Sequence, residues 1–401
     1  MYENAAFLAA FLLIYSAIAG RIERSLISGP IVFTVAGLLL GPDGLGVLRI
    51  DISGEGLRLL AELTLAMVLF TDAANADFGV VRANLGLPER LLGVGLPLTI
   101  VLGFLCAAFV FPALGVLEMA LLATILAPTD AALGKPVVAN RMVPAVMHEA
   151  LNLESGLNDG ICVPIVVILL GLAVGIQIEG GTLGHVAWVV VEEIGVGLIA
   201  GLALTWLTIR MLHFAEERGW ISENWVEIPI VALAAACFAA AQAAGGSGFI
   251  ACFVGGLLLS GLGARHKEEL LRGAEHMGEA LALLTWVVFG GIVVPRMLDR
   301  VTWPALVYAV LSLTVARMLP VFLCLIGTRT SASDKLFIGW FGPRGLATIV
   351  FAVLVLDAKL PGNDTIMLAA GWTVILSIVS HGLSANPLVK AIERRREGPM
   401  A

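Results

Sequence analysis

The sequence predicts an all-α polytopic membrane protein with about thirteen transmembrane helices. Of its 401 residues, 59% are hydrophobic and only 14% are charged, whereas a soluble domain carries roughly 25% charged residues. The mean hydropathy is +0.96. Apolar runs long enough to cross about 30 Å of hydrocarbon as a helix recur along the whole chain. Together these observations exclude a water-soluble fold.

Apolar runs between clusters of Gly, Pro and charge predict the helices in chain order. In the first part of the chain we expect helices over residues 4–20, 28–42, 57–76, 89–111, 116–139 and 144–176. In the second part we expect helices over residues 186–211, 225–243, 248–264, 279–297, 303–327, 334–357 and 364–385. The first run lacks a basic start and is long for a signal peptide, so we interpret it as a retained helix.

The distribution of Lys and Arg predicts the orientation, because cytoplasmic loops hold most of these residues. If the N-terminus lies outside and the C-terminus lies in the cytoplasm, most Lys and Arg fall in the odd-numbered loops and the tail. The other loops then hold only Arg49, Arg58, Arg296, Arg300 and Lys359. Two basic residues, Arg317 and Arg344, remain within the membrane. We therefore expect a multi-pass protein of the plasma (inner) membrane, surrounded by lipids.

Other functional classes find little support. The five cysteines lie in apolar runs without metal-site spacing, so we interpret them as small buried side chains. HExxH, GxSxG and GxxxxGK[ST] motifs are absent, and the charge pattern does not favour nucleic-acid binding. We expect neither an enzyme nor a resident cofactor. Residues 386–401 are expected to form a short basic cytoplasmic tail, with no nucleotide-binding domain in this chain.

The predicted fifth helix contains the segment LAPTDAALGKPVV. Pro128 lacks an N–H and disfavours helix at the residue before it, so the helix should break around Pro128, Thr129 and Asp130. Backbone groups freed at membrane depth must be buried in protein or line a cavity, where they can coordinate a cation. The alternative is a simple proline kink whose polar residues bond their own backbone.

The predicted sixth helix begins with the polar segment HEALNLESGLNDGI. Ser155 and Asp159 are four residues apart and share one helical face, to which Asn152 adds a third polar position. Glu154 and Asn158 have the same spacing. A carboxylate with hydroxyl and amide oxygens suits a hard cation, and the carboxylate can bind a proton instead. The alternative is a polar seam that joins helices, which explains two intramembrane carboxylates poorly.

The combination of PTD (128–130) and ESGLND (154–159) resembles the signature of the NhaP-type cation:proton antiporters, a branch that includes the animal Na+/H+ exchangers. Three further segments are similar to motifs of that family: LFTDA (69–73), VAR ending at Arg317, and GPRG (342–345). Each motif alone is weak, and their combination is specific.

The resemblance implies a fold of two inverted repeats with broken helices 5 and 12, divided into a core and an interface domain. The implied parts are interface helices 1–3 over residues 1–76, core helices 4–6 over 89–176, a linking helix 7 over 186–211, interface helices 8–10 over 225–297 and core helices 11–13 over 303–385. The interface domain of family members dimerises, so we expect a homodimer.

The resemblance also implies roles for single residues. The ion-binding set would be Asp159, Asn158, Ser155, Thr129 and Asp130, with Na+ held at Asp159, Ser155 and Thr129.

By the same resemblance Glu154 pairs with Arg317 as a structural ion pair. Arg344 would offset the carbonyl ends at the second break and meet Asp130. Several family members have a Glu near this point of the third helix, where this chain has Asp72. Because Asp72 departs from the family pattern, we expect for it at most an accessory role. His148 heads the polar sixth helix, where a histidine serves either as a pH sensor or, more often, as an ordinary interfacial group.

These residues predict the exchange of Na+ (or Li+) for H+, with both ions competing for Asp159. Since an amide, Asn158, precedes this carboxylate, we expect electroneutral one-for-one exchange. K+/H+ exchange is the alternative within transporters, because Na+ and K+ sites differ in size more than in chemistry. An uncoupled channel or sensor on the same fold is a further alternative, which the intact Thr129, Asn158 and Asp159 disfavour.

Overall fold

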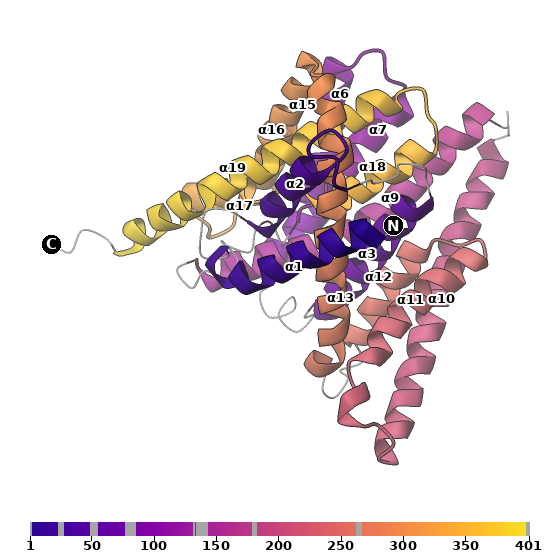
Figure 1. Cartoon of the computed structure of the whole chain (residues 1–401). Coiled ribbons are helices and arrows are strands. Elements are labelled where there is room, and N and C mark those ends of the chain that lie inside the picture. Colours follow the sequence, from indigo (N-terminus) through magenta and orange to yellow (C-terminus); the bar gives the residue numbers. More distant parts are fainter. Residues whose placement is uncertain are drawn as a thin grey trace.

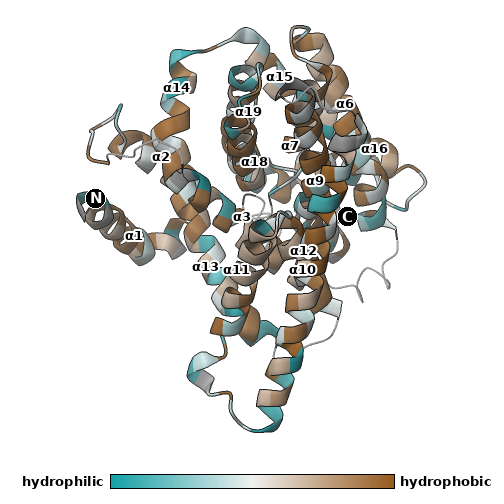
Figure 2. Cartoon of the chain, turned by 90° about the vertical axis from the view of Figure 1, so that its right-hand side faces the viewer, coloured by the Kyte–Doolittle hydropathy of each residue, from teal (hydrophilic) through white to brown (hydrophobic). Residues whose placement is uncertain are grey.

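The chain forms a bundle of helices in a computed structural model (Figure 1). The structure describes residues 2–22, 28–48, 55–76, 86–130, 133, 143–178, 183–261 and 267–397. Hydrophobic residues predominate along most of the helices, whereas hydrophilic residues are more frequent near helix ends and connecting turns (Figure 2). This distribution fits a membrane protein. Helices satisfy their own backbone hydrogen bonds and can cross the hydrocarbon region, whereas turns leave backbone groups that need water or other partners.

The helices follow the predicted order. The N-terminal part comprises α1 (Tyr2–Ile22), α2 (Gly29–Leu40), α3 (Glu55–Asn75), α5 (Leu87–Arg90), the π-helical turn η1 (Leu91–Gly95), α6 (Leu96–Val110), α7 (Val116–Ile125) and α9 (Ala145–Ile178). The middle part comprises α10 (Leu183–Glu217), η2 (Glu223–Trp225), α11 (Ile228–Ala243), α12 (Gly248–Gly261), α13 (Lys267–Val288), the π-helical turn η3 (Phe289–Val293) and α14 (Val294–Asp299). The C-terminal part comprises α15 (Trp303–Leu313), α16 (Val315–Cys324), α17 (Ala332–Trp340), α18 (Leu346–Asp357) and α19 (Asn363–Glu397).

Each predicted segment contains helix in the structure. By length and composition, six helical stretches of the described residues can cross a membrane, and six shorter apolar helices accompany them. The all-helical membrane fold is therefore confirmed, while the number of thirteen crossings stays a prediction.

The helices pack into two groups. One group contains α2, α3 and α10 to α13, and the other contains α6, α7, α9 and α15 to α19. Contacts of α9 with α3, α10 and α12, and of α3 with α18, join the groups. The assignment of these groups to an interface domain and a core domain stays a prediction.

Some boundaries differ from the predicted ones. The tenth predicted helix begins at Lys267 rather than at residue 279. The prediction started too late because the first half of this helix is amphipathic, and its charged residues interrupt the apolar run. The last helix continues to Glu397, so the expected tail is helical through that residue. The eleventh predicted helix is interrupted at Thr314, whose φ of −107° and ψ of −82° end α15. Of the fifth predicted helix, residues 131–139 lie outside the described residues except for Leu133.

Candidate functional site

The two predicted breaks are both present, and they meet. Helix α7 ends at Ile125 and is followed by a non-helical segment through Asp130. Helix α17 ends at Trp340, and the chain becomes helical again at Leu346, the start of α18. The backbone N–H of Asp130 donates to the carbonyl of Pro343 at 2.8 Å. The non-helical segments of α7 and α17/α18 are therefore joined directly by their backbones.

At this crossing, charged side chains bond backbone groups that the broken helices leave without helical partners. The Arg344 guanidinium is fully buried, and its Nη1 donates to the carbonyls of Ala127 and Pro128 at 3.0 and 3.1 Å. The Asp130 carboxylate accepts the backbone N–H of Leu346, the first residue of α18, at 2.8 Å. A cation at a C-terminal end and an anion at an N-terminal end both offset the helix dipole. Arg344 and Asp130 are thus each bonded to backbone groups of the opposite segment, while a direct bond between their two side chains stays a prediction.

Two glycines of the GPRG segment make this close approach possible. A Cβ atom at Gly345 would overlap the Asp130 carboxylate, and a Cβ atom at Gly342 would overlap the Arg317 guanidinium. The charged groups therefore occupy space that any other residue at these two positions would fill.

Side chains of α9 lie against the first break. The Ser155 hydroxyl donates to the carbonyl of Thr129 at 2.5 Å. The Asn158 amide nitrogen donates to the Thr129 hydroxyl at 2.7 Å. Thr129, Ser155, Asn158 and Asp159 are all buried. The structure thus gathers four of the five residues of the predicted ion-binding set at one place, with Asp130 adjoining in sequence. Asn152, which the spacing places on the same stripe, is exposed and does not belong to this cluster.

Two oxygen atoms of this cluster stand out. Among the residues that the structure describes, the Asn158 amide oxygen and one Asp159 carboxylate oxygen are buried without a hydrogen-bond partner. Buried polar groups are normally paired, because leaving one unpaired costs free energy. Amide, hydroxyl and carboxylate oxygens are ligands for hard cations, and a carboxylate can accept a proton at the same atom. The cluster can therefore hold either a small cation or a proton.

The buried carboxylate one turn away is already paired. Glu154 accepts hydrogen bonds from Nη1 and Nη2 of Arg317 at 2.5 and 2.7 Å, and each side chain is only 1% exposed. Arg317 lies in the first turn of α16, directly after the interruption at Thr314. This bidentate pair uses both Glu154 oxygens, so it acts as a brace between α9 and α16.

Asp72 lies on α3, which belongs to the other helix group. A Cβ atom added to Gly156 of α9 would contact the Asp72 side chain at 3.8 Å. Gly156 precedes Asp159 by three residues and therefore shares its helical face. Asp72 is thus a second carboxylate beside the cluster, on the opposite side of the boundary between the two groups.

Sequence reasoning missed the polar residues of α19. The Ser377 hydroxyl accepts the backbone N–H of Arg344 at 2.7 Å. His381 Nε2 lies 2.7 Å from the carbonyl of Trp340, the last residue of α17. The Trp340 indole donates to the Ser384 hydroxyl at 2.8 Å. The signal in the sequence is the spacing of Ser377, His381 and Ser384, which places all three on one face of an apolar helix.

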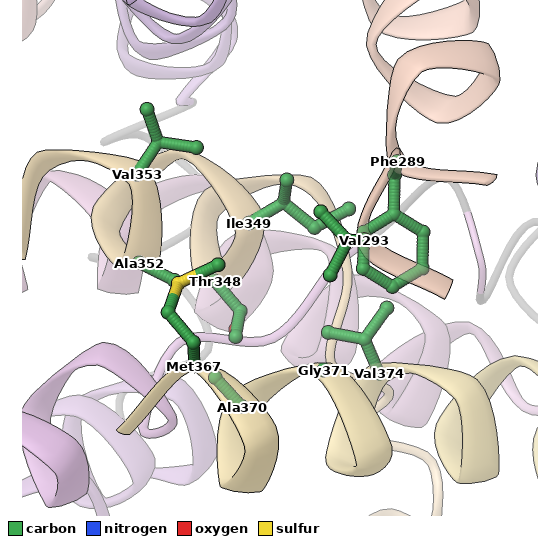
Figure 3. Close-up of a pocket in the computed structure, with 10 residues that line it drawn as sticks. All are labelled: Phe289, Val293, Thr348, Ile349, Ala352, Val353, Met367, Ala370, Gly371 and Val374. Atoms are coloured by element: carbon green, nitrogen blue, oxygen red, sulfur yellow. The ribbon is translucent and has the colours of Figure 1, made fainter. Parts of the chain in front are cut away.

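A small apolar pocket lies elsewhere, between η3 and the helices α18 and α19 (Figure 3). Its lining includes Phe289 and Val293 on one side and Ile349 and Val374 on the other. The hydroxyl of Thr348 already donates to the carbonyl of Ile125 at 3.0 Å. With its one polar side chain occupied in this way, the pocket lacks the oxygen ligands that a cation requires.

Comparisons with curated proteins agree with the motifs. The K(+)/H(+) antiporter NhaP2 of Shewanella sp. (strain ANA-3) is 26% identical over 380 residues, which cover 94% of this chain and 64% of that protein. The K(+)/H(+) antiporter NhaP of Alkalimonas amylolytica is 28% identical over 377 residues, with 93% and 64% covered. The chain thus spans less than two thirds of the length of these relatives.

The fold and the family are also matched. The structure of the sodium proton antiporter MjNhaP1 from Methanocaldococcus jannaschii at pH 8 superposes with a TM-score of 0.77 at 20% identity, covering 95% of this chain and 99% of that one. The family described as "Sodium/hydrogen exchanger, transmembrane" matches residues 7–391. The resemblance to the NhaP-type antiporters and their fold is therefore confirmed. This multi-pass membrane protein belongs to the sodium/hydrogen exchanger family.

Proposed function

We propose that the protein is a secondary antiporter that exchanges a monovalent cation for H+, with Asp159 as the group that binds either ion. The observation that carries this proposal is the pair of buried, unpaired oxygens of Asn158 and Asp159 beside the crossed helix breaks. Family membership and the names of the relatives point in the same direction.

The chemistry follows from the burial of the carboxylate. An unpaired charge at membrane depth is costly, so the empty, anionic form of Asp159 resists passage through a closed intermediate. A bound proton or a bound monovalent cation neutralises that charge. Movement between inward-open and outward-open states is then favoured only when the site is loaded, and loading with the two ions in turn gives exchange.

We propose Na+ or Li+ as the exchanged cation, held by oxygens of Asp159, Ser155 and Thr129, with Asn158 and Asp130 completing the set. The hydroxyl and amide oxygens favour a small hard cation, and MjNhaP1 is a sodium proton antiporter. K+ is the second candidate, because the Shewanella and Alkalimonas relatives are named K(+)/H(+) antiporters.

The decisive experiment is dissipation of a preformed pH gradient in proteoliposomes on addition of Na+, Li+ or K+, compared side by side. We expect Na+ and Li+ to release the gradient faster than K+. A faster response to K+ would reverse the choice of cation, and no response to any of the three would refute the antiporter proposal. Liposomes with the Asp159→Asn variant control for leak.

The assembly and its placement are also proposals. We propose a homodimer in the inner membrane, formed through the interface helices of residues 1–76 and 225–297, with the N-terminus outside and the C-terminus in the cytoplasm. Native mass measurement in lipid should give twice the mass of one chain, and a monomer alone would contradict the dimer.

Thiol labelling from one side of the membrane, at single cysteines placed near residues 2 and 397, tests the orientation.

A further inference from the structure

The segment between α17 and α18, residues 341–345, has no helical ladder of its own. The backbone N–H of Arg344 follows a proline and lies outside both helices, so it needs an acceptor from another element. At membrane depth no water replaces a missing partner, and an unpaired N–H costs several kcal/mol. The position of this segment therefore depends on the element that supplies the acceptor.

That element is α19. Ser377 supplies the acceptor for Arg344 N–H at 2.7 Å, so it fixes the backbone at the second break. His381, one turn later, is 2% exposed and places Nε2 2.7 Å from the Trp340 carbonyl. Its ring also stacks on the Trp340 ring, with centroids 5.1 Å apart. One face of α19 thus contacts the break on both sides, at its start and near its end.

The contacts continue from this face to the candidate ion site. Arg344, fixed by Ser377, bonds the carbonyls of Ala127 and Pro128 through its guanidinium. The next residue, Thr129, is bonded to Ser155 and Asn158. Hydrogen bonds, together with the side chain of Arg344 and the backbone between Pro128 and Thr129, therefore link the Arg344 backbone to the residues beside Asp159.

We infer that Ser377 and His381 are positioning residues for the ion site, acting through Arg344 and the two helix breaks. This inference rests on the proposed exchange function and extends it to α19. Loss of the contacts made by Ser377 and His381 shifts the oxygens around Asp159 but removes none of them. These two residues therefore set the affinity for the cation rather than the capacity to bind it.

Thr373 provides a matched control. It lies one turn before Ser377 on α19 and is fully buried, but its hydroxyl donates to Ala369 of its own helix at 2.7 Å. Thr373→Val and Ser377→Ala each remove one buried hydroxyl from the same helix. Only the second change removes a bond to the break.

The test combines two measurements on the full-length protein. Amide hydrogen exchange in detergent should become faster in residues 342–346 and 127–130 of Ser377→Ala and remain unchanged in Thr373→Val. In proteoliposomes the KM for the cation should rise about fivefold in Ser377→Ala, as expected for one lost neutral hydrogen bond, with Vmax nearly unchanged. Ser377→Thr, which retains a hydroxyl, should restore the wild-type KM.

Equal effects of Ser377→Ala and Thr373→Val, or unchanged amide exchange at residues 342–346, would overturn the inference. His381→Leu supplies a second variant, which keeps the Ser377 hydroxyl but removes the contacts of the imidazole with Trp340 and with Ser377, and it should also raise amide exchange at the break. A wild-type protein without cation-driven proton flux would refute the proposed function, whereas the amide exchange data would still decide the role of α19.

Discussion

Arg317 and Glu154 form a bidentate ion pair that is almost completely buried, with both carboxylate oxygens used and each side chain 1% exposed. Another carboxylate of the same helix, Asp159, keeps an oxygen without a partner among the described residues. Two acidic groups five positions apart thus have opposite environments. One is committed to a structural bond, and the other is available to a ligand.

We expect Glu154→Gln to lower the free energy of unfolding by about 3 to 5 kcal/mol, because it leaves the Arg317 guanidinium buried without a counter-charge. The measurement is the midpoint of thermal unfolding in detergent. A variant that is stable and fully inactive would mean that Glu154 serves the transported ion instead.

An exposed ion pair offers the comparison. Arg58 and Asp357 join α3 to α18, and their side chains are 46% and 54% exposed. Solvent screens such a pair, so Asp357→Asn should change the unfolding free energy by less than about 1 kcal/mol. Equal losses in the two variants would show that burial is not the cause of the Glu154 effect.

We expect Asp159→Asn to abolish exchange while the protein remains folded. The amide can neither release a proton nor supply a negative charge to a cation. The measurement is proton flux driven by each cation in proteoliposomes, with the thermal midpoint as the control for folding. Near-normal flux in this variant would remove Asp159 from the mechanism.

The two glycines of the second break give a steric prediction. Gly345→Ala and Gly342→Ala introduce a Cβ atom into the space of the Asp130 carboxylate and the Arg317 guanidinium. We expect each to lower stability by about 1 to 3 kcal/mol, as overpacked sites do, and to reduce exchange strongly. The control is Gly195→Ala on α10, where nothing lies within 4 Å of an added Cβ atom. Equal behaviour of all three variants would contradict the role of the close approach.

The fold could be predicted from the sequence because its main determinants are local. Pro128 and Pro343 lack a backbone donor, which favours a break at each position. Pro164, Pro320 and Pro387 nevertheless lie inside continuous helices, so the second break was expected from the resemblance of GPRG to the family motif. The interruption at Thr314 could not be predicted in this way, because the residue is β-branched but neither Pro nor Gly. The Thr314 hydroxyl donates to the carbonyl of Val310 at 2.6 Å, and a bond of this kind often bends a helix.

The site was predictable in part. Spacing placed Ser155 and Asp159 on one face, but it also included Asn152, because a period of 3.6 residues does not tell where along a helix a neighbour ends. Ser377 and His381 were missed for the related reason that a helical face does not identify its partner. Only the structure shows that this face of α19 meets the segment around Arg344.

The stoichiometry of exchange depends on the residue beside the central carboxylate. Asn158 is an amide that does not titrate in the physiological range, so the pair Asn158 and Asp159 carries one exchangeable charge. If Asp159 takes one proton in one direction and one cation in the other, the site carries the same charge in both loaded states. The cycle then moves no net charge across the membrane.

Two other carboxylates lie near enough to alter this count. Asp130 is bonded to the N–H of Leu346 at the start of α18, where a fixed negative charge is stabilised by the helix dipole. Asp72 stands on α3 beside Gly156. We expect neither to exchange a proton during the cycle, so Asp72→Asn should leave the number of charges moved per cycle unchanged.

The same competition fixes the form of the pH dependence. Low pH protonates Asp159 and excludes the cation, whereas high pH deprives the return step of protons, so the rate should pass through a bell-shaped optimum. The test of stoichiometry is cation/H+ exchange in proteoliposomes whose membrane potential is clamped with K+ and valinomycin. The rate should be the same at every imposed potential. If exchange accelerates or reverses with the potential, more than one charge moves for each cation, and a second carboxylate must take part.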